Sequence, residues 1–135
     1  MEPAQNLSQF KEKLLIMASH AEGMVTRAIR AHLDRDEPAA KQALETDEVI
    51  DQLEIQIDRI ALRLLADNTD DFKLRQITCG MKIAQDLERV GDEASTIARR
   101  SILLMCLPNL NTSTDITEMT FLVNAMQKDA LDAFV

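Results

Sequence analysis

The chain has 135 residues, which is enough for one domain of ordinary size. Hydrophobic residues make up 46% of it and charged residues 28%, a composition typical of a globular protein and not of a disordered one. The net charge of −8 opposes binding to phosphate backbones, so we expect no nucleic-acid partner. No apolar run is long enough to cross a bilayer, and residues 1–6 lack the basic-then-apolar order of a signal peptide.

The composition favours an all-helical fold. Aromatic residues are 3% of the chain, and there are only three glycines and three prolines, so the core must be built from Leu, Ile, Met and Ala. The two cysteines, Cys79 and Cys106, would lie about 40 Å apart on one continuous helix, which is too far for a disulfide. Two reduced thiols suit a cytoplasmic protein, and this is the location that we expect.

The first two predicted helices are joined by a short turn at residues 34–36. Apolar residues at steps of three and four predict the first helix over residues 7–33, with Asn6 as its N-cap. The second helix is expected to begin near Glu37, with Asp36 as its cap and Pro38 in its first turn. It should end among the turn-forming residues 67–70.

The rest of the chain predicts two more helices. The third should run over residues 71–105, and a loop around Pro108 should follow it. The fourth should begin after Thr114 and continue to residue 135 without a breaker, so we expect the chain to be a piece of a longer protein. Long helices joined by short turns pack antiparallel. The predicted fold is therefore all-α, an up-down-up three-helix bundle plus a fourth C-terminal helix.

Two pairs of carboxylates are the candidate functional residues. Asp47 and Asp51 lie on the second predicted helix, and Glu88 and Asp92 lie on the third. Each pair has the spacing i and i+4, which places both carboxylates on one face of a helix. In an antiparallel hairpin, residues equally far from the turn lie side by side. Residues 47 and 92, and likewise 51 and 88, are equally far from the predicted turn at 69–70, so the four carboxylates should be level.

Four level carboxylates repel one another and need a neutralising partner. That partner can be a cation, a nearby arginine or a proton. An all-oxygen cluster suits hard ions such as Mg²⁺, Mn²⁺, Ca²⁺ or iron. Gly91, between the two acids of the third helix, lets a neighbouring backbone or an ion approach. The alternative is a solvated acidic surface, in which these side chains simply face water.

Other chemistry finds little support in the sequence. His20 is level with Asp51 and is a weaker candidate ligand, while His32 carries no signal. A ferritin-like di-metal enzyme needs a Glu three residues before each histidine, but Met17 and Ile29 occupy those positions. No phosphate-binding loop, zinc-type Cys/His spacing or nucleophile motif is present. We therefore expect a protein that is not an enzyme.

Three segments together match the pattern of a known family. They are Asp47-x-x-Ile50-Asp51-x-Leu53-Glu54, then Leu74-Arg75, then Asp86-Leu87-Glu88-Arg89-Val90-Gly91-Asp92. In these residues the chain resembles the PhoU family. The segment from Glu88 to Asp92 is the most specific of the three. The chain departs from the family at the start of the third helix, where Phe72-Lys73-Leu74-Arg75 keeps only the Leu-Arg of a common Asp-Leu-Arg.

The resemblance implies an architecture and a set of metal ligands. Members of the family consist of two tandem three-helix bundles, each with two acidic motifs that in some members bind clusters of iron or zinc. By this likeness, residues 1–107 form the first bundle, and 108–135 form a linker and the first helix of an incomplete second repeat. The implied metal ligands are Asp47, Asp51, Glu88 and Asp92. Iron, zinc, manganese and magnesium remain open as the bound metal.

The resemblance also implies a function. It indicates a cytoplasmic negative regulator of phosphate uptake and phosphate-starvation signalling, which acts between a phosphate ABC transporter and a sensor histidine kinase and reaches the membrane only through such partners. A domain of a sodium–phosphate cotransporter and a metal-free helical adaptor remain alternatives. The fourth helix would leave its apolar face exposed, so we also expect a homodimer or a domain-swapped assembly of this chain.

Overall fold

The computed structural model describes residues 3–67, 70–110 and 115–135, and the side chains of residues 3–6 are outside the description. The described residues form four helices and no strand. Helix α1 spans Pro3–Asp34, α2 Glu37–Ala66, α3 Asp71–Leu104 and α4 Asp115–Phe134. The all-α prediction is confirmed, and the predicted helix ends agree with the observed ones to within about four residues.

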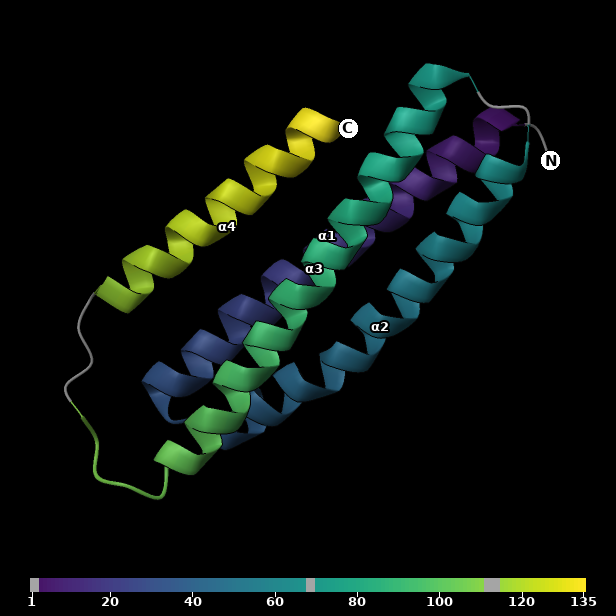
Figure 1. Ribbon diagram of the computed structural model, residues 1–135. Helices are drawn as coiled ribbons and strands as arrows, with labels where there is room; N and C mark the ends of the chain where they lie inside the picture. Colours follow the sequence, from purple (N-terminus) through teal and green to yellow (C-terminus); the bar gives the residue numbers. More distant parts are fainter. Residues whose placement is uncertain (1–2, 68–69, 111–114) are drawn as a thin grey trace.

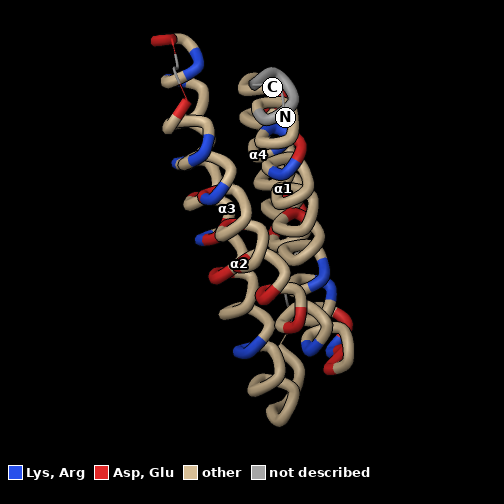
Figure 2. The backbone as a smooth tube through the Cα atoms, turned by 90° about the vertical axis from the view of Figure 1, so that its right-hand side faces the viewer, with Lys and Arg blue, Asp and Glu red and all other residues tan. Residues whose placement is uncertain are grey.

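Helices α1, α2 and α3 form an antiparallel up-down-up bundle in which each helix packs against the other two (Figure 1). Helix α4 lies along the outside of this bundle and packs on α1 (Figure 1). Figure 2, turned by 90°, shows the helices from the side, with α1 and α4 running along each other. The predicted bundle with an added fourth helix is therefore confirmed.

Aspartates begin two of the helices. The Oδ1 atom of Asp36 accepts a hydrogen bond from the backbone N of Ala39 at 3.0 Å, as predicted for the start of α2. Asp70 caps α3 in the same way, because its Oδ1 accepts from the backbone N of Lys73 at 2.8 Å. The predicted cap of α1 is wrong: Asn6 lies inside the helix, which already begins at Pro3.

The core lies where α1, α2 and α3 meet. One stripe of α1 is fully buried, with Phe10, Leu14, Met17 and Met24 as its largest members, and it is a stripe that the sequence predicts. Nearer the α1–α2 turn the buried residues become small. They include Ala28, Ala31, Ala40, Ala43, Ala94, Ser95, Ala98 and Ser101. Small side chains allow the three helices to approach closely at this end of the bundle.

Two hydrogen bonds join α4 to α1. The Nδ2 of Asn124 donates to Thr26 Oγ1 at 3.0 Å, and the Nε2 of Gln127 donates to the backbone oxygen of Ala18 at 3.0 Å. Leu131 is the only residue of α4 that is buried. Large apolar side chains on the rest of the helix are exposed; they include Met119, Phe121, Leu122, Val123 and Met126. None of the helices described is long and apolar enough to cross a membrane.

Candidate metal centre

The four predicted ligands lie on the face that α2 and α3 share. Asp47 and Asp51 are on α2, and Glu88 and Asp92 are on α3. The buried stripe of α2 runs through Ile50, and that of α3 runs through Leu87 and Gly91, so the carboxylates stand at the edge of the core. Asp47 and Glu88 are half-buried, whereas Asp51 and Asp92 are exposed. The α2–α3 hairpin therefore brings both pairs to one level, as the sequence predicts.

The carboxylates are close enough to disturb one another's ionisation. Partial burial raises the pKa of Asp51, and the negative charges of Asp47, Asp92 and Glu48 raise it further. Partial burial also raises the pKa of Glu88, with added contributions from the charge of Asp92 and a hydrogen bond to it. The influence of Asp92 on Asp51 crosses from α3 to α2. The two acidic pairs are therefore electrostatically one group.

Glu54 is a further member of this group. Partial burial raises its pKa, and the charges of Asp58, Asp51 and Asp92 raise it further. Its spacing extends the stripe of Asp47 and Asp51 by one more step along α2. The i, i+3, i+7 spacing of Asp51, Glu54 and Asp58 could have indicated from the sequence that Glu54 belongs to the group. The same spacing is equally typical of an acidic helix face that simply faces water. We call Asp47, Asp51, Glu54, Asp58, Glu88 and Asp92 the acidic cluster.

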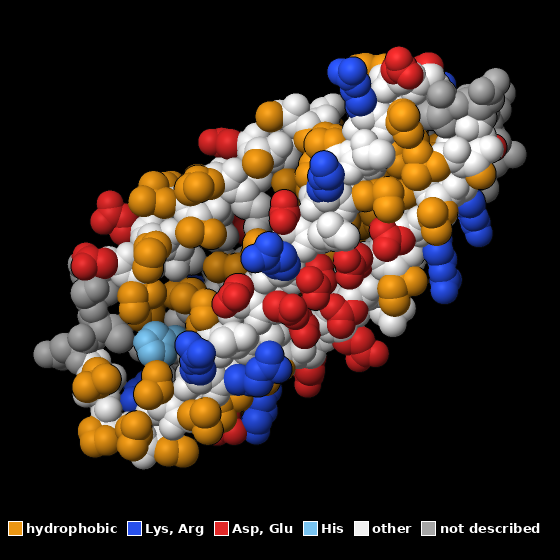
Figure 3. Space-filling model, in the orientation of Figure 1, with side chains coloured by type: hydrophobic (Ala, Val, Ile, Leu, Met, Phe, Trp, Pro, Cys, Tyr) orange, Lys and Arg blue, Asp and Glu red, His pale blue; other side chains and the backbone are white. Residues whose placement is uncertain are grey.

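The acidic cluster is not neutralised by basic side chains. Figure 3 shows the Asp and Glu side chains gathered in the middle of this face. The salt bridges found among the described residues are Lys41 with Glu37 and Lys73 with Asp70, and neither involves the cluster. Of the three neutralising partners that the sequence left open, arginine is therefore not used in this structure.

The acidic cluster has the oxygen donors that a hard cation prefers, but its side chains are not arranged around one point. Among the residues described, no three Asp, Glu, His or Cys side chains are grouped closely enough to hold a metal ion as they stand. Gly91 of α3 lies beside Asp47 of α2, because a Cβ built on Gly91 would be 3.7 Å from Asp47 Oδ1. The metal-ligand roles of Asp47, Asp51, Glu88 and Asp92 stay a prediction.

The two histidines are not part of this centre. His20 is half-buried on α1, and the groups that raise the pKa of Asp51 and Glu88 all belong to α2 and α3. A hydrogen bond from Arg27 to Thr46 Oγ1 shows that α1 meets α2 on the side of Thr46, whereas Asp47 and Asp51 interact with α3. His20, seven residues before Arg27, shares the face of α1 that meets α2 on the side of Thr46, and its level relative to Asp51 stays a prediction.

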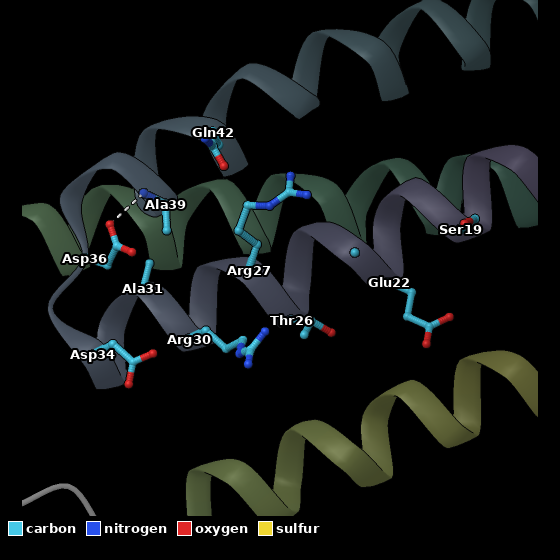
Figure 4. Close-up of a pocket in the computed structure, with 11 residues that line it drawn as sticks. Ser19, Glu22, Thr26, Arg27, Arg30, Ala31, Asp34, Asp36, Ala39 and Gln42 are labelled. Atoms are coloured by element: carbon cyan, nitrogen blue, oxygen red, sulfur yellow. Dashed lines mark hydrogen bonds between the residues drawn. The ribbon is translucent and has the colours of Figure 1, made fainter.

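A polar groove of about 620 Å³ is lined by α1, the α1–α2 turn and the start of α2. Arg27 and Arg30 are its basic groups, and Glu22, Asp34 and Asp36 are its acidic ones. Figure 4 shows Arg27 directed toward α2 and Arg30 directed toward the side of α4. Because the two guanidinium groups diverge, the groove does not form a two-arginine anion site.

Comparison with known proteins places the chain in a family. The family model for the PhoU domain matches residues 14–101. The chain is 33% identical over 132 residues to a phosphate-specific transport system accessory protein PhoU homologue of Aquifex aeolicus, covering 97% of this chain and 60% of that protein. It is 37% identical over 131 residues to the homologue with the same name from Pseudomonas putida, covering 95% of this chain and 51% of that protein.

The fold gives the same result. The crystal structure of PhoU from Pseudomonas aeruginosa matches with a TM-score of 0.93 and 35% sequence identity, and the match covers 98% of this chain and 65% of that one. The chain therefore spans between half and two thirds of the length of these relatives. From the domain match, the sequence identity and the shared helical arrangement, the chain belongs to the PhoU family.

Proposed function

We propose that this chain acts in phosphate uptake and phosphate-starvation signalling as a metal-binding helical adaptor. The observation that carries the proposal is the acidic cluster that α2 and α3 bring together in a chain of the PhoU family. Relatives named as accessory proteins of a phosphate-specific transport system support the link to phosphate. An accessory role also supports a regulator in place of an enzyme.

The proposed metal ligands are Asp47, Asp51, Glu88 and Asp92. Their carboxylate oxygens suit Mg²⁺, Mn²⁺ or iron, and zinc remains possible as a partner of carboxylates. The bound ion would supply positive charge that ties α2 to α3 and removes the repulsion between the two acidic pairs. Glu54 is positioned to join or support this set because its charge couples to Asp51 and Asp92.

The proposed partners are the phosphate ABC transporter and a sensor histidine kinase, met on the cytoplasmic side of the membrane. In this proposal residues 1–107 form the first bundle and residues 108–135 begin a second one. The packing of α4 on the outside of α1, with most of its apolar residues exposed, supports such a division. A homodimer is a further prediction, and a monomer by light scattering at high concentration would refute it.

The metal part of the proposal is tested by elemental analysis. We expect the purified chain, loaded with Mn²⁺, Fe²⁺ or Zn²⁺ and desalted, to retain metal. The variant Asp47→Asn, Asp51→Asn, Glu88→Gln, Asp92→Asn should lose it, because neutral amides are weak ligands for these ions.

A matched control removes four charges elsewhere, through Glu12→Gln, Glu22→Gln, Asp129→Asn and Asp132→Asn. This variant should retain as much metal as the unmodified chain, since its substitutions are exposed and lie on α1 and α4. Absence of retained metal under every loading condition would leave the metal-free adaptor as the remaining function. Equal loss in both variants would mean that net charge, and not the cluster, attracts the ion.

A further inference from the structure

The face that α2 and α3 share changes from acidic at one end to apolar at the other. On α2 the stripe that starts at Asp47 continues by steps of three and four to Leu62 and Leu65. On α3 the stripe of Glu88 and Asp92 continues in the other direction to Leu74 and Met81. We call Ile55, Leu62, Leu65, Leu74 and Met81 the apolar patch. Residues 65 and 74 are equally far from the α2–α3 turn, so the two ends of the patch are level.

The apolar patch is open to solvent. Leu62 is 62% exposed, and Ile55 and Leu74 are each 43% exposed, while Leu65 and Met81 are half-buried. Figure 3 shows hydrophobic side chains between α2 and α3 directly beside the acidic cluster. Helix α4 packs on α1, so it does not cover this face (Figure 1). Adjacent apolar and charged areas of this kind are typical of interaction surfaces.

Charge decides which occupant suits the face. Among the described residues, the six carboxylates of the acidic cluster have no salt bridge. Four of the six are half-buried: Asp47, Glu54, Asp58 and Glu88. A second copy of the chain would present the same uncompensated negative face, which opposes pairing of like with like. A partner with basic groups beside apolar ones gains both from the patch and from the cluster.

We propose that this face docks an amphipathic helical segment of a protein partner, with apolar residues on the patch and Lys or Arg side chains on the acidic cluster. The inference deepens the proposed adaptor function and rests on it. Because metal and the basic end of the segment use the same carboxylates, metal loading weakens the basic contact and leaves the apolar contact in place.

The test uses the 135-residue chain and two synthetic helical peptides of about 18 residues. The first peptide carries leucines on one half of a helical stripe and arginines on the other half. The second is identical but has glutamates in place of the arginines. In chelator, we expect fluorescence anisotropy to show that the arginine peptide binds at least about tenfold more tightly. Equal affinity of the two peptides would overturn the proposal.

Paired variants locate the contact. Leu62→Gln with Leu74→Gln should weaken binding of the arginine peptide by about tenfold or more, because both leucines lie in the patch. Leu103→Gln with Phe121→Gln is the matched control, since these residues are 70% and 72% exposed elsewhere. An equal loss in the control pair would overturn the proposal. All four positions are exposed, so circular dichroism should show folded proteins in each case.

Hydrogen exchange gives a readout that does not depend on variants. We expect the arginine peptide to slow exchange in residues 55–65 and 74–81. Slowing confined to the apolar groove of about 520 Å³ between α3 and α4, which Val90, Met119 and Val123 help to line, would overturn the proposal. A dimer in sedimentation that is lost in Leu62→Gln would also overturn it, in favour of a second copy.

Metal retention separates this inference from the proposed function. Leu62→Gln with Leu74→Gln should retain metal like the unmodified chain, because neither residue supplies a ligand. If the unmodified chain retains metal but does not bind the peptide, the docking face is contradicted and the metal centre is not. If it binds the peptide but never retains metal, the metal centre is contradicted and the docking face is not.

Discussion

Arg35 shows how one residue fixes the end of the bundle. It has a φ of 52°, in the left-handed region that glycine usually occupies, and it ends α1. The backbone N of Asp36 donates to the oxygen of Ala31 at 3.0 Å, which is the hydrogen bond expected after a left-handed residue at a helix end. The guanidinium Nη2 donates to the backbone oxygens of Met105 and Leu107, each at 2.7 Å. These bonds tie the α1–α2 turn to the end of α3.

Substitution at Arg35 separates the backbone strain from the hydrogen bonds. Arg35→Ala keeps the left-handed conformation and loses both bonds to carbonyl oxygens, so it should lower the free energy of unfolding by about 1.5 to 3 kcal/mol. Arg35→Gly loses the same bonds but relieves strain of about 1 kcal/mol. Urea unfolding should therefore give the glycine variant a higher free energy of unfolding than the alanine variant. The reverse order would show that the left-handed backbone at residue 35 carries no strain.

Two glycines of α3 differ in what surrounds them. A Cβ built on Gly80 would overlap Phe10, approaching its Cζ atom at 2.6 Å, and Phe10 is fully buried. A Cβ on Gly91 would meet Ile50 Cδ1 at 3.1 Å, the end of a flexible side chain. From the sequence, Gly91 was the glycine expected to allow close approach. The closest approach in the structure is instead at Gly80, which periodicity alone does not reveal.

Alanine substitutions test this difference. Gly80→Ala should destabilise the chain by about 1 to 3 kcal/mol, because a buried aromatic ring must move. Gly91→Ala should lie within about 1 kcal/mol of the unmodified chain, because the helical preference of alanine offsets a small shift of Ile50. Chemical unfolding of both variants measures the two effects. A larger loss at Gly91 than at Gly80 would contradict the packing described here.

At the scale of the elements, the sequence predicted most of the fold. Helical periodicity and the Asp36 cap gave α2 within one residue at its start, because caps and apolar stripes act locally. The start of α1 was missed because Asn6 resembles a cap but sits within continuing helix. Level position did predict the acidic pairs, because both stripes adjoin the core.

The hairpin of α2 and α3 should respond to pH in a defined direction. The pKa values of Asp51, Glu54 and Glu88 are raised above their ordinary values of 3.8, 4.5 and 4.5. Between the ordinary and the raised pKa values, the folded state therefore holds protons that the unfolded state has released. The free energy of unfolding is highest below the ordinary pKa values, and it falls as the pH rises through the raised ones, because the carboxylates then become charged in the folded state.

We therefore compare the chain in chelator with the variant Asp51→Asn, Glu54→Gln, Glu88→Gln. At pH 7 the variant should have the higher melting temperature, since it lacks the repulsion. The difference in melting temperature should narrow as the pH falls toward the ordinary pKa values of the carboxyl groups, because protonation then removes the repulsion in the unmodified chain as well. Melting curves between pH 7 and about pH 4.5 measure this gap. A gap that stays constant would show that the three carboxylates titrate as they do in the unfolded chain.

At the scale of the whole molecule, one bundle presents two different faces. The α2–α3 face carries the acidic cluster and the apolar patch. The α4 side carries a helix with exposed apolar residues, which packs on α1 through hydrogen bonds and Leu131. The sequence predicted the exposure of α4 because its stripe has no complete partner. It could not predict that the apolar residues which continue the acidic stripes stay exposed, since that depends on how the three helices pack.

In the proposed metal centre, the carboxylates of α2 and α3 gather around a shared cation. This claim is tested by thermal unfolding of the unmodified chain and of the variant Asp47→Asn, Asp51→Asn, Glu88→Gln, Asp92→Asn, each in chelator and in Mn²⁺. Mn²⁺ should raise the melting temperature of the unmodified chain, because an ion that binds only the folded state stabilises it. It should leave the variant unchanged. Equal melting temperatures of the unmodified chain with and without the ion would contradict the claim.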